Sequence, residues 1–152
     1  MADEGHENAR SRTGETSRVI GRNVARLRGE DGISARALAE RVSELGVPMS
    51  QSGVSDIERG ARTVSADQLT GLAVALRVSP VGLLMPFSST GDLDEECALT
   101  GTGQEMSTFV LSWLLCDAPF TDDRSGSDAA RTVRTAFRRR SLPPWAWGAE
   151  GV

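Results

Sequence analysis

The feature that most constrains the fold is a series of five short helix patterns between residues 17 and 87. In each pattern apolar side chains recur three or four positions apart, which places them on one face of a helix. The first pattern contains Val19, Ile20, Asn23, Val24 and Leu27. A serine that can cap a helix N-terminus opens each later pattern, and these serines are Ser34, Ser50, Ser65 and Ser79. Five short helices within 71 residues predict a compact all-α domain over residues 17–87.

The parts of the chain outside this domain carry weaker signals. Residues 1–16 lack an apolar period and are rich in Glu, Ser, Thr and Arg, so we expect a disordered arm. Residues 88–152 are expected to form a small, mostly helical C-terminal extension. Within it an apolar stripe predicts a helix near 104–116, a serine-capped basic helix is expected near 127–140, and an irregular tail follows. The strand-like piece of this extension is residues 97–100.

Composition excludes most catalytic and metal chemistry. Two cysteines, Cys97 and Cys116, have no second pair beside them, and the single histidine, His6, lies in the polar N-terminal tail. This set nearly rules out a zinc site and leaves a serine or cysteine nucleophile without the usual histidine base. The sequence also contains no phosphate-binding loop. We therefore expect no catalytic residues, no metal and no cofactor, and a protein that is not an enzyme.

Hydropathy and charge narrow the class further. No stretch approaches the ~20 apolar residues of a membrane-spanning helix, so we expect a soluble cytoplasmic protein without a membrane partner. The net charge of -4 argues against a protein that coats nucleic acid, but the charge is segmented: +2 over residues 17–87, -8 over 88–130 and +4 over 131–152. All 17 basic residues are arginines, which indicates the codon usage of a high-GC bacterium.

A longer motif combines several of the predicted helices. It reads Leu-Ala-Glu at residues 38–40, Val-Ser at 54–55, Ile-Glu at 57–58 followed by Gly60, and Leu-x-x-Leu-Ala-x-Ala-Leu-x-Val from Leu69 to Val78. This motif resembles the helix-turn-helix family of phage repressor and Cro proteins, often called XRE-like, over residues 18–86. The resemblance implies a five-helix repressor-like domain in a transcriptional regulator that binds double-stranded DNA as a homodimer. With the exclusive use of arginine, we expect such a regulator to come from a high-GC actinobacterium.

The helix near residues 51–59 would enter the major groove. Its apolar face at Val54 and Ile57 leaves the other face polar, and the predicted base contacts are Gln51, Ser52, Gly53 and Asp56. The predicted phosphate contacts, from two helix starts and the loop after this helix, are Ser34, Arg36, Ser50, Arg59, Arg62 and Thr63. In family members an arginine of the first helix pairs with a glutamate behind the recognition helix. Arg28 and Glu58 match these two positions.

Three features of the motif allow other interpretations. Residues 50–60 alone also fit an ordinary capped surface helix. About five additional residues between Val42 and Val54, relative to the family pattern, predict a longer second helix and a more relaxed turn than in phage repressors. Asp56 on the groove face indicates either selectivity, because an acid can accept from cytosine N4, or weak binding, because it repels phosphates.

The C-terminal extension also has more than one interpretation. The stripe of the helix near 104–116 either packs on the preceding domain or forms a dimer seam. Its members are Met106, Phe109, Val110, Trp113 and Leu114. The arginines at 138–140 form a solvated face, follow phosphates, or pair with the acidic residues of segment 88–130. The alternative function for the whole chain is an antitoxin-like or other protein-interaction module that binds a protein partner through residues 88–152.

Overall fold

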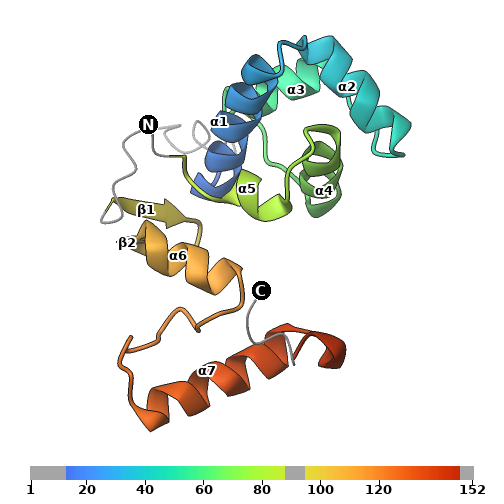
Figure 1. Cartoon of the computed structure of the whole chain (residues 1–152). Helices are drawn as coiled ribbons and strands as arrows, with labels where there is room; N and C mark the ends of the chain where they lie inside the picture. Colours follow the sequence, from blue (N-terminus) through green and yellow to red (C-terminus); the bar gives the residue numbers. More distant parts are fainter. Residues whose placement is uncertain (1–12, 88–94, 148–152) are drawn as a thin grey trace, which may run out of the picture. The chain divides into compact units, whose positions relative to one another are not determined.

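The structure, a computed structural model, describes residues 13–87 and 95–147. The chain divides into two compact units, Met1–Phe87 with Ala98–Gly103, and Ser88–Cys97 with Gln104–Val152. The first helices are α1 (Glu15–Glu30), α2 (Ala35–Glu44), α3 (Gln51–Glu58), α4 (Ala66–Ala75) and α5 (Pro80–Leu84). They are followed by β1 (Glu96–Leu99), β2 (Gly103–Met106), α6 (Ser107–Leu114), α7 (Asp128–Ser141) and the short 3-10 helix η1 (Pro144–Ala146). Figure 1 labels the α-helices and strands.

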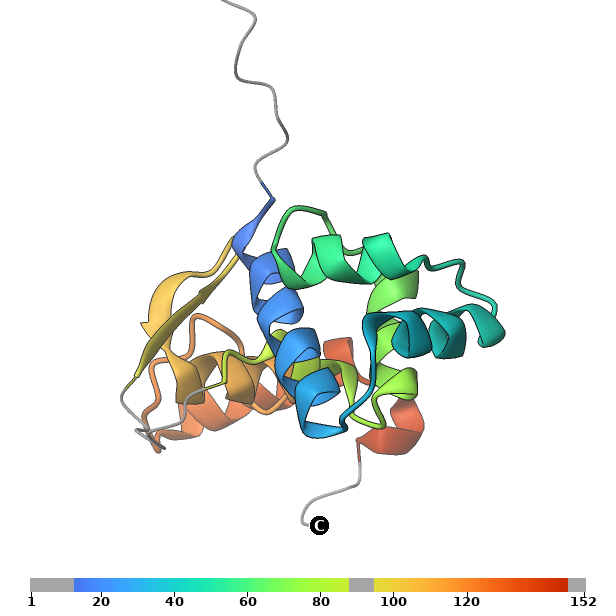
Figure 2. The same cartoon turned by 90° about the horizontal axis from the view of Figure 1, so that it is seen from above.

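The helices of the first unit bury one apolar core. α1 packs against α3 and α5, α2 packs against α3 and α4, and α4 packs against α5. Fully buried side chains of this core are Val24, Leu38, Val42, Val54, Ile57, Leu72 and Leu83. Figure 2 shows the same five helices from a second direction. Because α3 contributes Val54 and Ile57 to the core, its opposite side faces away from it.

The predicted serine caps are confirmed. The Oγ atoms of Ser34, Ser50, Ser65 and Ser79 each accept a hydrogen bond, at 3.0–3.2 Å, from the backbone N–H three residues further along the chain. Ser65 also forms a capping box with Gln68. After α3 the chain turns at Gly60, whose φ of +65° is the left-handed conformation that favours glycine at a helix end. Local hydrogen bonding therefore fixes the starts of α2 to α5.

The predicted start of the first helix at Ser17 is two residues too late. α1 begins at Glu15, whose carboxylate lies in the first turn and pairs with Arg18 at 3.3 Å and Arg22 at 3.0 Å. Thr16 and Thr100 also exchange two hydrogen bonds from backbone N–H to side-chain Oγ1, at 3.2 and 2.8 Å. A partner 84 residues away is invisible to local sequence patterns. Residues 1–12 of the predicted arm, with His6, lie outside the described residues.

The expectation of an all-α chain is corrected by a small two-stranded sheet, β1 paired with β2. β1 confirms the strand-like piece near Cys97. β2 occupies the first residues of the helix expected at 104–116, so α6 begins only at Ser107. Gly101 and Gly103 have φ of +94° and +70°, and these two left-handed positions turn the chain back on itself. α7 is confirmed as a basic helix capped by a serine at position 127.

The apolar stripe of α6 is covered within its own unit by the segment that follows it. Val110 is fully buried. The guanidinium of Arg124 lies over the ring of Phe109, 3.4 Å from its centroid. The rings of Trp113 and Phe120 meet edge to face with centroids 5.8 Å apart. These contacts occupy three of the residues predicted for a dimer seam, while Met106 and Leu114 are half-buried.

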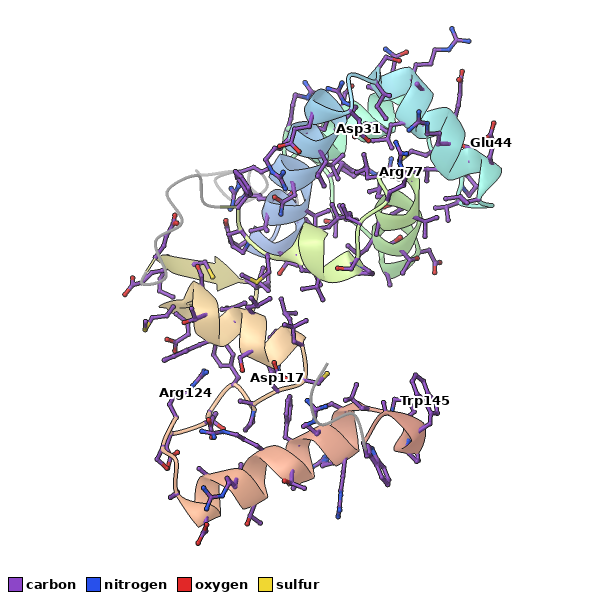
Figure 3. All side chains as sticks on the ribbon, in the orientation of Figure 1. Asp31, Glu44, Arg77, Asp117, Arg124 and Trp145 are labelled. Carbon is purple, nitrogen blue, oxygen red and sulfur yellow. The ribbon has the colours of Figure 1, made fainter. Side chains whose placement is uncertain are left out.

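Arginines of α7 hold the same covering segment. Arg134 pairs at 2.8 Å with Asp122, whose side chain is 2% exposed, and Arg138 pairs at 3.0 Å with Asp117. Figure 3 labels Asp117 and Arg124 in the segment that joins α6 to α7. Of the three interpretations of the arginines at 138–140, the internal acidic partner therefore applies to Arg138.

In the described part of the chain no helix is long and apolar enough to cross a membrane.

Candidate nucleic-acid interface

The outer side of α3 presents a continuous polar stripe. Positions 51, 52, 55, 56 and 59 share this side, because Val54 and Ile57 turn the other side into the core. A shallow depression on the surface is lined by Ser50, Gln51, Ser52, Ser55, Asp56 and Arg59. The structure therefore brings three of the four predicted base contacts together with two of the predicted phosphate contacts.

The serines in and beside this stripe have short side chains that are partly engaged with α3 itself. The hydroxyl of Ser50 caps α3 and lies 3.0 Å from the hydroxyl of Ser52. The hydroxyl of Ser55 donates to the carbonyl oxygen of Gln51 at 3.1 Å. The side chain of Gln51 is exposed at the first turn. Short side chains keep the backbone of α3 accessible to a partner, which suits a helix that enters a groove.

Gly53 is the predicted base contact that the structure places elsewhere. It is buried, and its position four residues before Ile57 puts it on the inner side of α3. A Cβ atom built on Gly53 would lie 3.1 Å from Nη1 of Arg62 and 3.2 Å from Oγ of Ser50. The missing side chain therefore leaves room for the guanidinium of Arg62 beside the N-terminal turn of α3.

The orientation of α3 is fixed by an ion pair to α1. Nε of Arg28 donates to Oε1 of Glu58 at 2.6 Å, and its Nη2 donates to Oε2 at 3.1 Å. Nη1 of Arg28 donates to the carbonyl oxygen of Ile33 at 2.8 Å. The hydrogen bonds to the Glu58 carboxylate raise the pKa of Arg28 above its usual value, so the guanidinium stays charged. The structure thus brings together the two residues that the family resemblance pairs.

Sequence analysis missed a second contact between α1 and α3. A Cβ atom built on Gly21 would lie 2.1 Å from the carbonyl oxygen of Ile57, so α1 touches the backbone of α3 at this point. Gly21 sits in the interior of a helix, where glycine costs about 1 kcal/mol relative to alanine. That cost is the signal that could have identified it, since a glycine inside a helix pattern usually has a packing reason.

Asn23 is the polar member of the α1 stripe, and the structure shows why it is there. Its side chain is 2% exposed. Nδ2 donates to the carbonyl oxygens of Leu83 at 3.0 Å and Met85 at 2.6 Å, which end α5. The carbonyls of a last helical turn have no partner within the helix. Asn23 therefore fastens α5 to α1, the helix that also supports α3.

The predicted phosphate contacts other than Ser50 lie at α2, at the C-terminal end of α3 and in the loop that follows α3. Ser34 caps α2, and Thr63 is exposed in the loop after α3. Arg36 pairs with Glu40 at 2.8 Å on the exposed side of α2, and the Glu40 carboxylate raises the pKa of Arg36. Arg59 pairs with Asp56 on α3 itself. The helix N-terminus of α3 and the Arg62 guanidinium beside it form a positive corner suited to an anion.

Comparison with known families agrees with this arrangement. Residues 19–83, from α1 into α5, match the family model of a helix-turn-helix domain. No curated protein and no solved structure matches the chain. Residues 19–83, which include α3 and the helices α1 and α2 that pack against it, are therefore similar to a helix-turn-helix domain.

Proposed function

We propose that this chain is a bacterial, cytoplasmic transcriptional regulator of the XRE type that reads a specific DNA sequence in the major groove with α3. The observation that carries the proposal is the continuous polar stripe of α3, presented by a helix-turn-helix domain that buries the other side of the same helix. A rigid helix with an outward polar face is the element that can enter the groove and contact base edges.

The contacts divide between bases and backbone. Gln51 and Ser52 stand at the first turn of α3, where the amide of Gln51 can make a bidentate contact with adenine. Ser34 and Ser50 lie at the N-termini of α2 and α3, whose unpaired N–H groups attract phosphates. Arg36, Arg62 and Thr63 complete the phosphate contacts, as positioning contacts that carry no sequence information.

Two variants separate base reading from phosphate contact. Gln51→Ala should weaken binding to the selected site by about 1–3 kcal/mol and leave binding to scrambled DNA nearly unchanged. Arg62→Ala should weaken both duplexes and reduce the slope of log affinity against log salt by about one unit, because one fewer counterion is released. Both side chains are exposed, so neither change should disturb the core.

Selection of bound sites from random duplex DNA by the full chain tests the whole proposal. Enrichment of one motif would support sequence-specific binding, and an inverted repeat would support a homodimer on two half-sites. If no motif is enriched over the starting pool, or if neither variant changes binding, the assignment as a DNA-reading regulator is wrong.

The dimer itself is a proposal that rests on the symmetry of such operators. At α6 the exposed apolar side chains are Leu111 and the C-cap residue Leu115. Each lies two residues, or about half a turn, from the covered Trp113 side chain. Light scattering on the full chain should give the mass of a dimer. A truncation that ends near Phe87 should be monomeric if α6 contributes to the interface, and dimeric if the interface lies within the helix-turn-helix domain.

A second candidate function is favoured by one observation in the C-terminal extension. The side chain of Trp145, labelled in Figure 3, is 85% exposed, and exposed tryptophans are enriched where proteins bind each other. Residues 88–152 would then bind a protein partner, as in an antitoxin-like module. A stoichiometric partner that co-purifies with the full chain and is lost with Trp145→Ala would support this function.

A further inference from the structure

Arg59 shares the outer side of α3 with Gln51. It lies eight residues further along the chain, lines the same shallow depression, and its side chain is 70% exposed. The sequence places Arg59 among the phosphate contacts because it follows the helix. In the structure it instead ends the outer polar stripe of α3, which would face the groove, so Arg59 is a candidate for a base contact.

The guanidinium of Arg59 is held in place by its own helix. Its Nη2 pairs with the carboxylate of Asp56, and its Nε donates to the carbonyl oxygen of Ser55 at 3.3 Å. Arginine has five N–H donors in a planar fork. Two donors are therefore engaged, and both N–H groups of Nη1 and one of Nη2 remain for a partner. A fork that is already oriented loses less side-chain entropy when it binds.

Resting on the proposed function, we propose that Arg59 reads a guanine in the major groove and that Asp56 is the residue that positions it. Guanine presents two acceptors, O6 and N7, that match the arginine fork. A phosphate also offers two acceptors, but the Asp56 carboxylate beside the fork, 40% exposed, would repel a phosphate. In the groove the same carboxylate can accept from N4 of a cytosine. The acid therefore favours a base over the backbone as the partner of Arg59.

The geometry of α3 also limits where the guanine lies. Eight residues of α-helix rise about 12 Å. Successive base pairs are about 3.4 Å apart, so this rise corresponds to three or four steps along the DNA. The guanine read by Arg59 should therefore lie in the same half-site as the base read by Gln51.

A base analogue tests the proposal directly. The selected duplex is prepared with 7-deazaguanine, which lacks the N7 acceptor, in place of each guanine in turn, and the affinity of the full chain is measured for each duplex. At one guanine the wild-type chain should lose about fivefold or more, and a guanine-to-adenine exchange there should cost about 5- to 150-fold. In Arg59→Ala both substitutions should become nearly neutral at that guanine.

Two further variants, Arg59→Lys and Arg36→Ala, serve as controls for the loss of a positive charge. Arg59→Lys keeps the charge but not the planar fork, so it should keep its affinity for scrambled DNA while its sensitivity to 7-deazaguanine falls below that of the wild type. Arg36→Ala removes a proposed phosphate contact that also pairs with an acid of its own helix, Glu40. It should weaken binding to every duplex by a similar factor and leave the sensitivity to 7-deazaguanine intact. The melting temperature of each variant reports whether the domain is folded.

The role of Asp56 has its own signature. Asp56→Ala should raise affinity for scrambled DNA, because an acid is removed, and at the same time lower the preference for guanine, because the fork is released. Asp56→Asn keeps an acceptor at the same place and should restore part of the preference. A purely structural role would not move these two quantities in opposite directions.

The outcomes separate the two levels of the proposal. If the wild-type chain selects no motif, the proposed function and the role of Arg59 both fall. If a motif is selected but Arg59→Ala keeps the full sensitivity to 7-deazaguanine at every guanine, only the role of Arg59 is overturned and the phosphate contact replaces it. If Asp56→Ala keeps the guanine preference of the wild type, Asp56 does not position Arg59.

Discussion

Replacing Glu58 by alanine should lower the free energy of unfolding by about 2 kcal/mol. The carboxylate accepts two hydrogen bonds from Arg28, at 2.6 and 3.1 Å, and the two side chains are only 13% and 25% exposed. Breaking a fully buried ion pair costs about 3–5 kcal/mol, because a charge is left without a partner. An exposed pair contributes about 0.2–1 kcal/mol. The Arg28–Glu58 pair lies between these limits.

The cost of Glu58→Ala should stay below that of breaking a fully buried pair, because Arg28 keeps other partners after the substitution. Arg28 keeps its hydrogen bond to the carbonyl oxygen of Ile33 at 2.8 Å, and its partial exposure allows water to reach the released donors. The penalty of stranding the guanidinium is therefore reduced, and about 2 kcal/mol is the expected total.

Urea unfolding of the full chain, followed by circular dichroism, measures this difference. Glu40→Ala is the matched control, because it breaks the Arg36–Glu40 pair, whose side chains are 76% and 59% exposed, and should cost less than about 0.5 kcal/mol. In a double-mutant cycle with Arg28→Ala the two charges should show a coupling energy above about 1 kcal/mol. If Glu58→Ala costs no more than Glu40→Ala, the pair does not hold α3 against α1.

Three further substitutions test the supports around α3 by the same unfolding assay. Gly21→Ala should cost about 2 kcal/mol, because overpacking against the carbonyl of Ile57 outweighs the gain in helix propensity of about 1 kcal/mol; a stabilised variant would contradict the close approach. Asn23→Ala should also cost about 2 kcal/mol, since two carbonyls at the end of α5 lose their donor, and an unchanged midpoint would show that water replaces it. Gly53→Ala should change stability little but weaken binding to selected and scrambled DNA as Arg62→Ala does, because the new methyl group displaces the Arg62 guanidinium. Unchanged DNA binding would show that the position of the Arg62 guanidinium does not depend on Gly53.

Local chemistry made much of the first unit predictable from the sequence. A serine that accepts from a backbone N–H three residues away needs no distant partner, so the starts of α2 to α5 could be located from single residues. The apolar stripe that contains Val54 and Ile57 is equally local, since it depends only on the helical period. The polar face of α3 follows from the same stripe.

Other features depend on contacts that no local pattern contains. The two hydrogen bonds between Thr16 and Thr100 lie at the start of α1, which begins two residues earlier than predicted, within a segment that the sequence predicts to be disordered. Arg124, whose φ of +61° is unusual for a residue with a side chain, places its guanidinium over Phe109 and covers a stripe that the sequence leaves open. The position of Gly53, in contrast, was predictable, because the helical period groups it with Ile57 on the buried side.

The pairing of arginines with acids in the first unit is compatible with selective DNA binding by an acidic chain. Six arginines of residues 17–87 are held in ion pairs: Arg18, Arg22, Arg26, Arg28, Arg36 and Arg59. Non-specific affinity for DNA comes almost entirely from cations that neutralise phosphates, and a paired arginine must give up or share its carboxylate to do so. The domain is therefore expected to bind arbitrary DNA weakly. In the proposed complex the affinity for an operator would then depend on the contacts of α3 with base edges. Asp56, which weakens attraction to phosphates, would increase the difference in affinity between the operator and all other sequences.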